Sequence, residues 1–275
     1  MSIHDHKETR ETFGEIMDYD VIIIGAGIAG MTAAIYVVRA GKTALVLEST
    51  MHGGQIINTV NIENWPGQLG ISGAKLSEEI YHQMNNLGAT IEYSEAISIE
   101  RTDIVGDKSH FVVKTDDAEY SCGAIIIATG TEPRKLSKEQ TADAGKRPIS
   151  YCATCDGALY KGKPVVVVGS GNTAKHEMRY LSNIASKVYH IHHDDKIPED
   201  ATAVFVAIGR VPNTKWLNGI VELDDHGYVI ADESCTTSAP GIFVAGDVRT
   251  KSTRQLVTAA GDGAIAASAA VEYLS

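Results

Sequence analysis

Short apolar runs that lead into glycine turns recur along the chain and mark its expected strands. Residues 20–25 (DVIIIG) are too few for a helix and are typical of a strand buried on both faces of a parallel sheet. A helix predicted over about 28–40 ends at Gly41, where a glycine cap is expected, and residues 43–48 (TALVLE) predict the next strand. This order predicts one complete βαβ unit.

The same pattern returns in the second half of the chain. Residues 164–169 (PVVVVG), a helix near 173–182 and a strand near 187–192 (KVYHIH) predict a second unit. Further buried strands are expected at 124–128, 203–208 and 241–245. An Ala-rich helical stretch over 255–274 follows the last of them and is expected to return to the first sheet.

These elements predict an α/β fold with two dinucleotide-binding units. A chain of 275 residues is long enough for two domains. We expect a discontinuous first domain over 19–130 and 241–275, a smaller inserted domain over 131–240, and an N-terminal extension over 1–18.

Composition narrows the expected partners and compartment. A formal net charge of −11 argues against a nucleic-acid partner, because such proteins normally carry a basic face. No apolar run reaches the ~20 residues that span a bilayer, and the polar start has no signal core, which favours a cytoplasmic protein without membrane association. Four cysteines, of which two are close together, favour a reducing compartment with one catalytic pair.

The first glycine turn carries the fingerprint Gly25-x-Gly27-x-x-Gly30 between a predicted strand and a predicted helix. The first glycine permits the turn, the second lets backbone amides approach a pyrophosphate, and the third allows close helix packing. Glu48 lies 23 residues after Gly25, near the offset expected for a carboxylate that accepts from a ribose hydroxyl. The segment therefore predicts a dinucleotide site.

Cys152 and Cys155 form a Cys-x-x-Cys pair just ahead of the second unit. The spacing allows a reversible disulfide, and such motifs often lower one thiol's pKa so that a nucleophilic thiolate exists near neutral pH. A zinc site would need two more Cys or His ligands at similar spacing, whereas Cys122 and Cys235 stand alone. We expect those two cysteines to be buried small hydrophobes and the chain to hold no metal.

From Asp20 onward the chain resembles the low-molecular-weight thioredoxin reductases of bacteria over nearly its whole length. Beside the paired glycine fingerprints, the motifs that carry the resemblance are GGQ at 53–55, ENWPG at 63–67, ATG at 128–130, CATCD at 152–156, AIGRVPNT at 207–214, AGD at 245–247 and RQ at 254–255. The resemblance implies a flavoprotein disulfide reductase that holds FAD at the first fingerprint, acts on a thioredoxin-like protein and forms a homodimer.

The resemblance also implies roles for single residues. By similarity, Cys155 meets the reduced flavin, Cys152 attacks the partner's disulfide and Asp156 is the acid/base. Exchange through a mixed disulfide requires one sulfur accessible to the partner while the other faces the flavin. The cofactor contacts implied outside the first fingerprint are Gly54, Gln55 and Asn64 in the flavin region, Thr129 and Gly130, Asp247 at the ribityl and pyrophosphate portion, and Arg254 and Gln255 at the isoalloxazine ring.

The second unit departs from the family's pattern. Its fingerprint, residues 169–174 (GSGNTA), would bind NADPH in an ordinary member, where a His-Arg-Arg run holds the 2′-phosphate; here residues 192–194 read HHD. Two charge-assisted contacts are lost, which at ~1.5–3 kcal/mol each weakens binding by roughly a hundred- to ten-thousand-fold. Only nine residues, 194–202, precede the next buried strand, while a crossover with its helix needs at least ~10–12.

A third βα unit cannot fit, and several tens of residues of the family's second domain are expected to be missing. This truncation resembles the ferredoxin-dependent flavin thioredoxin reductases, so the predicted function is electron transfer from reduced ferredoxin through FAD to the Cys152–Cys155 pair and on to a thioredoxin-like disulfide. The alternatives are a thioredoxin reductase that uses NADH or NADPH and, from a different class, a non-catalytic FAD-binding interaction module.

Overall fold

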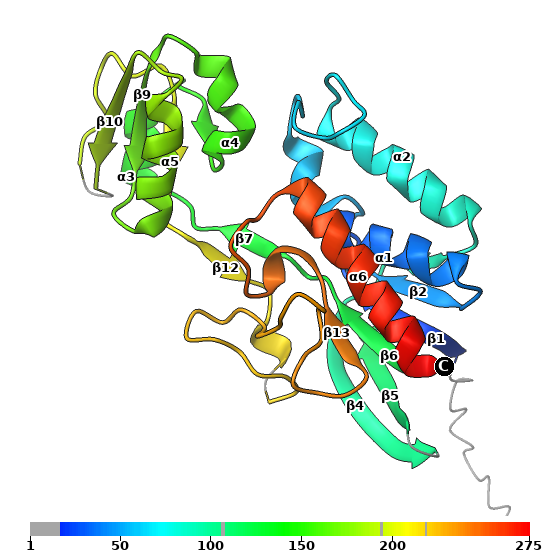
Figure 1. Ribbon diagram of the computed structural model, residues 1–275. Helices are drawn as coiled ribbons and strands as arrows, with labels where there is room; N and C mark the ends of the chain where they lie inside the picture. The colour runs from blue at the N-terminus through cyan, green and yellow to red at the C-terminus, as the bar shows by residue number, and fades with distance from the viewer. Residues whose placement is uncertain (1–16, 106–107, 193–194, 218) are drawn as a thin grey trace, which may run out of the picture.

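Two β-sheets joined by a narrow ribbon make up the molecule in Figure 1. The structure is a computed structural model that describes residues 17–105, 108–192, 195–217 and 219–275. Of the extension predicted over 1–18, the described residues include only Met17 and Asp18, which open the first strand. Among the described residues, no helix combines the length and apolar character needed to cross a membrane.

The larger sheet contains seven strands in the order β3-β2-β1-β6-β5-β4, with β13 also paired to β6. Strands β1, β2, β3, β6 and β13 run parallel, and β4 and β5 add an antiparallel hairpin beside β6. The bounds are β1 Met17–Ile24, β2 Ala44–Leu47, β3 Thr90–Glu92, β4 Ala96–Val105, β5 Lys108–Thr115, β6 Glu119–Ile127 and β13 Ile242–Val244.

Alternate residues of β1 serve the two faces of this sheet, as the pleat requires. Val21 and Ile23 pack in the cluster that holds the helices, whereas Ile22 and Ile24 pack with the hairpin on the opposite face. The helices on the first face are α1 Ile28–Arg39, α2 Gly73–Asn86 and α6 Leu256–Leu274.

Helix α6 lies directly against α1, as Figure 1 shows. A Cβ at Gly263 would stand 2.3 Å from the carbonyl oxygen of Ala29, so the two helix backbones are in contact at that point. Because β13 pairs with β6 and α6 packs on α1, the C-terminal segment belongs to the larger sheet, although the predicted domain bounds stay a prediction.

The smaller sheet is parallel, with the order β10-β9-β11-β8. Its described part contains no helix between β10 and β11, which confirms that the third βα unit is missing. The bounds are β8 Ile149–Ser150, β9 Pro164–Val168, β10 Lys187–Ile191, β11 Val204–Val206, α3 Lys138–Ala144, α4 Ala153–Asp156 and α5 Asn172–Ser182, with a 3-10 turn, η2, over Gly157–Tyr160.

The chain passes between the sheets twice, through β7 (Thr131–Pro133) and β12 (Arg210–Pro212), which pair antiparallel. Beside this ribbon the Thr129 hydroxyl donates to the Asn213 carbonyl over 2.9 Å, and the Asn213 amide donates back to the Thr129 carbonyl over 3.1 Å. The two crossings are therefore held side by side. The predicted α/β fold with two glycine-turn units is confirmed.

Candidate functional site

The first glycine turn is built for close backbone approach. Gly25 has a φ of 108°, and a Cβ there would lie 2.4 Å from the carbonyl oxygen of Ala128. A Cβ at Gly30 would lie 1.8 Å from the carbonyl oxygen of Gly25, whereas one at Gly27 meets no heavy atom within 4 Å. The first and third glycines thus serve packing, and the second leaves open backbone at the N-terminus of α1, as a pyrophosphate site requires.

Glu48 follows β2 and closes this turn. Its Oε2 accepts from the amide of Ala26 over 2.8 Å, and its Oε1 accepts from the amide of Thr50 over 3.1 Å. The hydroxyls of Ser49 and Thr50 also donate to Oε1, over 3.5 and 3.3 Å. A carboxylate oxygen has about two acceptor positions, so the capacity for a ribose hydroxyl lies on Oε2.

Gly54 and Gln55 open the short 3-10 helix η1 (Gly54–Asn58) beside the fingerprint. A Cβ at Gly54 would stand 3.4 Å from the Cα of Gly27, which places the two predicted cofactor segments side by side. Gln55 is exposed at the start of η1. These positions suit a shared ligand that runs from the glycine turn toward η1.

Asp247 lies in the short 3-10 helix η4 (Gly246–Val248), which follows β13. Its Oδ1 is buried and has no hydrogen-bond partner in the protein. Burial raises the pKa of Asp247, while the charges of Arg210, Lys251 and Arg254 act in the opposite direction. An orphaned buried carboxylate oxygen beside an open glycine turn fits the hydroxyl-bearing ribityl chain of FAD, because each such oxygen needs a donor.

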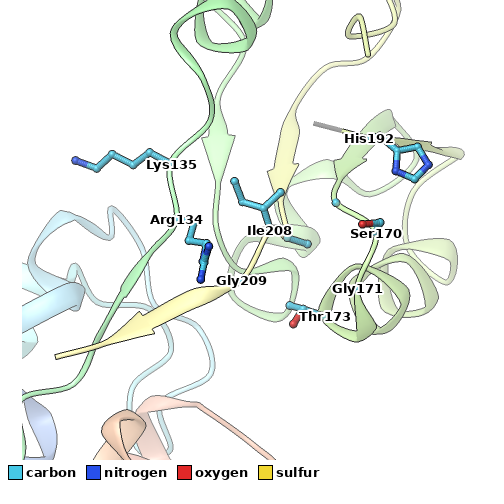
Figure 2. Close-up of a pocket in the computed structure, with 10 residues that line it drawn as sticks. Arg134, Lys135, Ser170, Gly171, Thr173, His192, Ile208 and Gly209 are labelled. Carbon is cyan, nitrogen blue, oxygen red and sulfur yellow. The ribbon is translucent and has the colours of Figure 1, made fainter. Parts of the chain in front are cut away.

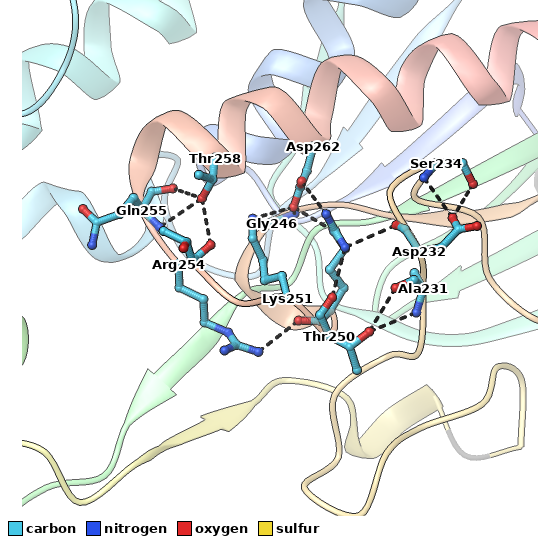
Figure 3. A network of polar contacts seen from close by, with 12 residues as sticks. Ala231, Asp232, Ser234, Gly246, Thr250, Lys251, Arg254, Gln255, Thr258 and Asp262 are labelled. Atoms are coloured by element: carbon cyan, nitrogen blue, oxygen red, sulfur yellow. Dashed lines mark hydrogen bonds and ion pairs between the residues drawn. The ribbon is translucent and has the colours of Figure 1, made fainter. Parts of the chain in front are cut away.

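A buried ion cluster holds the loop that carries Asp247 (Figure 3). Asp262 of α6 accepts from the Gly246 amide over 3.0 Å, from Arg249 over 2.9 and 2.8 Å, and from Lys251 over 2.7 Å. Asp262 is 4% exposed and Arg249 is 5% exposed. The cluster fixes the turn between β13 and α6, and no sequence motif pointed to it.

Arg254 and Gln255, the two residues predicted at the isoalloxazine ring, make different contacts in the structure. Arg254 folds back on its own loop, donates to the carbonyls of Asp247 and Arg249, and lies 4.1 Å from the ring centre of Tyr228. Gln255 instead caps α6, and its amide points toward the smaller sheet. The two side chains therefore point to different parts of the molecule, and their cofactor roles stay a prediction.

Gln255 links the predicted flavin region to the cysteines. Its Oε1 accepts from Asn64 over 3.0 Å, and its Nε2 donates to the Thr154 hydroxyl over 2.8 Å and lies 3.9 Å from the Sγ of Cys152. Gln255 thus bonds two residues that are distant in the sequence, Asn64 at 191 positions and Thr154 at 101 positions from it. The Cys-x-x-Cys turn is thereby docked against the N-terminus of α6.

Cys152 and Cys155 form a disulfide at the two ends of the first turn of α4. Cys155 is exposed and Cys152 is half-buried against Gln255, so the pair lies at the surface where the two sheets meet. In this disulfide form the more exposed cysteine is Cys155, which is the reverse of the exposure expected from the predicted roles, so thiol exchange at Cys152 requires the turn to move away from Gln255. Cys122 and Cys235 are buried, and burial raises their thiol pKa values to about 12 and about 11. Only the close pair is suited to thiol exchange near neutral pH.

Asp156 ends α4 and accepts from the Ser150 hydroxyl over 2.6 Å. The same hydroxyl accepts from the Cys152 amide over 3.2 Å. Ser150 therefore connects Asp156 to the cysteine turn. Thr129 and Gly130, by contrast, bond to Asn213 at the ribbon, so the side chain of Thr129 serves the crossing between the sheets.

The second glycine turn borders an open cavity of about 790 Å³ (Figure 2). Gly169 and Gly171 line it, with His192 beside Ser170. Arg134 and Lys135 lie on the opposite side, on the segment that follows β7, and the Lys135 chain extends away from the glycine turn. The positive charges of Arg134 and Lys135 are not apparent from the sequence around residues 192–194, because both residues belong to a different segment of the chain.

Comparisons with known proteins agree with this geometry. A family model described as pyridine nucleotide-disulphide oxidoreductase matches residues 19–202 and 193–264. The thioredoxin reductase of Bacillus subtilis (strain 168) is 36% identical over 304 residues, which cover 93% of this chain and 95% of that protein. A match of 304 positions is longer than this 275-residue chain, so tens of positions of the relative have no counterpart here.

Solved structures show the same likeness. The thioredoxin reductase from Streptococcus pyogenes MGAS5005 has a TM-score of 0.84 at 33% identity, over 94% of this chain and 98% of that chain. A ferredoxin-flavin thioredoxin reductase from Clostridium acetobutylicum has a TM-score of 0.59 at 28% identity, over 94% and 98% of the two chains.

The predicted cofactor and reaction class are confirmed at this level: the protein is an FAD-binding flavoprotein and an oxidoreductase that acts on a protein disulfide. The chain belongs to the low-molecular-weight thioredoxin reductase family of the pyridine nucleotide-disulphide oxidoreductases.

Proposed function

We propose that this thioredoxin reductase takes its electrons from reduced ferredoxin and passes them through FAD to the Cys152–Cys155 pair and on to a thioredoxin-like disulfide. The observation that carries the proposal is the docking of the Cys-x-x-Cys turn on Gln255, at the end of the unit with the open glycine turn. A homodimer in the cytoplasm is part of the same proposal and rests on the family resemblance.

The chemistry follows from the pair. Bound FAD would supply the two electrons that, with two protons, convert the disulfide to a dithiol. The Cys152 thiolate then attacks the partner's disulfide to form a mixed disulfide, and Cys155 displaces the reduced partner and restores the Cys152–Cys155 bond. In this proposal Asp156, which accepts a hydrogen bond from Ser150, exchanges a proton with the leaving thiol.

The ferredoxin donor is supported by what the smaller sheet lacks. Residues 192–203 join β10 to β11 without a helix in their described part, so one element of the family's nucleotide domain is missing. The likeness to the ferredoxin-flavin enzyme of Clostridium acetobutylicum adds limited support, since its TM-score of 0.59 is below the 0.84 of the thioredoxin reductase from Streptococcus pyogenes. Ferredoxin carries one electron at a time, so each disulfide reduced requires two encounters with it.

A nicotinamide dinucleotide donor is the second candidate, and one observation favours it. The cavity at the second glycine turn is large enough for part of a dinucleotide, and Arg134 adds a fixed positive charge to its wall. Arg134 therefore partly offsets the loss of the family's two arginines at 192–194, where this chain reads HHD.

A pair of matched variants separates these donors. At Gly27 and Gly171 an added Cβ meets no heavy atom within 4 Å, and their φ values of −71° and −83° suit any residue. Gly171→Glu would place a carboxylate at the second turn, and Gly27→Glu would place one at the first. Each change repels phosphate at its own turn without strain in the backbone.

The measurement is flavin bleaching after anaerobic mixing of the yellow protein with reduced ferredoxin, NADH or NADPH. We expect ferredoxin to bleach the parent and the Gly171→Glu variant at the same rate, and Gly27→Glu to be purified without FAD. Rapid bleaching by a nicotinamide dinucleotide, lost in Gly171→Glu, together with no bleaching by ferredoxin, would overturn the proposed donor. A yellow protein that reduces no protein disulfide with any donor would favour the non-catalytic module.

A further inference from the structure

Glu177 is a buried carboxyl group in the middle of α5. It is 8% exposed and lies on the packed face of the helix with Ala174 and Leu181, both fully buried. Its Oε2 is buried without a hydrogen-bond partner in the protein. A buried acid without full pairing costs stability, so its presence on an apolar helix face needs a reason.

The helix face that carries this carboxyl group packs against the redox turn. Helix α5 packs against α4, and Ala153 shares a buried cluster with Ala174 and Leu181, the two residues that flank Glu177 on this helix face. The nearby Ala153 amide lowers the pKa of Glu177. Ala153 is bonded to Cys152 and is itself 1% exposed. Glu177 therefore lies on the buried helix face that packs against the Cys-x-x-Cys turn.

The surroundings of Glu177 raise the pKa of its carboxyl group toward neutral pH. Burial raises its pKa to about 7, while the Ala153 amide and the charge of Arg210, on β12, act in the opposite direction. Strand β9, which also packs on α5, is Pro-Val-Val-Val-Val and adds no titratable group. On β10, His190 lies 2.6 Å from the Gly169 carbonyl oxygen, and on α4 Asp156 is engaged by Ser150.

Two negative charges compete in this turn once the disulfide is reduced. An ionised carboxylate close to a thiol raises the thiol's pKa, because the thiolate would add a second negative charge nearby. A protonated carboxyl group has no such effect, and it keeps the same place beside the Ala153 amide. The two groups are thus expected to titrate as a coupled pair.

We propose that Glu177 is a positioning residue of the redox centre, which lies on the helix face packed against the Cys-x-x-Cys turn and whose charge state sets how readily Cys152 becomes a nucleophile. The proposal rests on the proposed role of the pair. Below about pH 7, where Glu177 is protonated, Cys152 is expected to react faster than it would beside an ionised Glu177.

The test is the pH dependence of Cys152 alkylation by iodoacetamide between pH 5 and 10, with FAD bound, in a Cys155→Ser background. Cys122 and Cys235 are buried with raised thiol pKa values and do not interfere. Glu177→Gln keeps the shape of the side chain but cannot ionise. We expect its Cys152 midpoint to lie about half to one pH unit lower, which makes alkylation on the rising limb roughly three- to tenfold faster.

Two further variants keep the result interpretable. Glu177→Asp retains a titratable carboxyl group and is expected to fall between the parent and the Gln variant, which also tests the proposal if Gln prevents folding. His176→Gln removes an exposed titratable group from the same helix and is expected to match the parent.

Coincident profiles for the parent and Glu177→Gln, or an equal shift in His176→Gln, would overturn the proposal. Alkylation needs no protein partner, so this outcome is separate from a failure of the proposed function. That failure would appear as normal thioredoxin reduction by a Cys152→Ser variant.

Discussion

Replacing Asp262 with Asn is expected to weaken both the fold and the flavin site, because this carboxylate is the centre of the buried cluster that holds η4. Asp262 accepts four hydrogen bonds, three of which come from Arg249 and Lys251. Burial raises the pKa of Asp262, but the hydrogen bonds from Arg249 and Lys251 outweigh it and the net pKa is lowered. The carboxylate is therefore ionised throughout the working range of pH.

The size of the effect follows from the burial of the cations. The side chains of Arg249 and Lys251 are 7% and 6% exposed, so removing their counter-charge leaves two positive charges inside the protein. Breaking a buried pair by removal of one partner costs about 3–5 kcal/mol. At roughly 2–4 °C per kcal/mol, the melting temperature should fall by about 6–20 °C. The loop that carries Asp247 loosens with the cluster, so FAD is expected to bind more weakly.

The assay is thermal and urea unfolding of the FAD-loaded protein, followed by flavin fluorescence and circular dichroism. Asp232→Asn is the matched control: it removes the same charge from the neighbouring loop, but Asp232 is exposed and its carboxylate accepts from Ser234 of its own turn. The contact of Asp232 with Arg249 is made by the backbone carbonyl, which the substitution leaves in place. The control is expected to melt close to the parent. Equal melting temperatures for Asp262→Asn and Asp232→Asn would refute the reasoning.

Three more outcomes are expected. Cys152→Ser should lower thioredoxin reduction at least roughly a thousandfold, as loss of a nucleophile does, while flavin reduction continues and no mixed disulfide is trapped; trapping of the partner on Cys155 would contradict the assigned order. Gly30→Ala should yield colourless protein, because its Cβ would stand 1.8 Å from the Gly25 carbonyl oxygen. Since the folded-state pKa of Asp262 is depressed, its stabilisation is present above about pH 4 and is lost as pH falls further; urea midpoints between pH 3 and 5 should fall less steeply in Asp262→Asn.

The parallel strands could be predicted because each is a continuous apolar run that ends at a glycine. Strand β1 begins at Met17 and β9 at Pro164, within a few residues of expectation. The hairpin of β4 and β5 was missed although the sequence carries a signal for it: the pair Gly106-Asp107 stands between the two strands, and buried and half-buried positions alternate over residues 110–115. Continuous apolar runs do not mark this hairpin, because an alternating strand such as SHFVVKT has no such run. The short ribbon of β7 and β12 depends on pairing between segments about 80 residues apart, which no local pattern encodes.

The candidate site was predictable where one short motif carries the chemistry, as for Cys152 and Cys155. It was not predictable where charges from separate segments converge, as Arg249 and Asp262 do. Glu177 did leave a signal: it falls at the helical spacing of the apolar positions Ala174 and Leu181, where a charged residue is out of place. Arg254 shows the opposite case, since its motif matched the family while its side chain turns back to Tyr228.

The paired crossings through β7 and β12 explain how this chain tolerates a shortened second unit. Residues 134–209 are joined to the larger sheet through β7 and β12, which lie side by side. This segment is therefore an insertion whose two ends are fixed next to each other. Trimming such an insertion alters nothing at its attachment points. Laboratory exchange of this module between related enzymes should therefore succeed when both ribbon strands are carried along, and donor preference becomes a trait that can be transplanted.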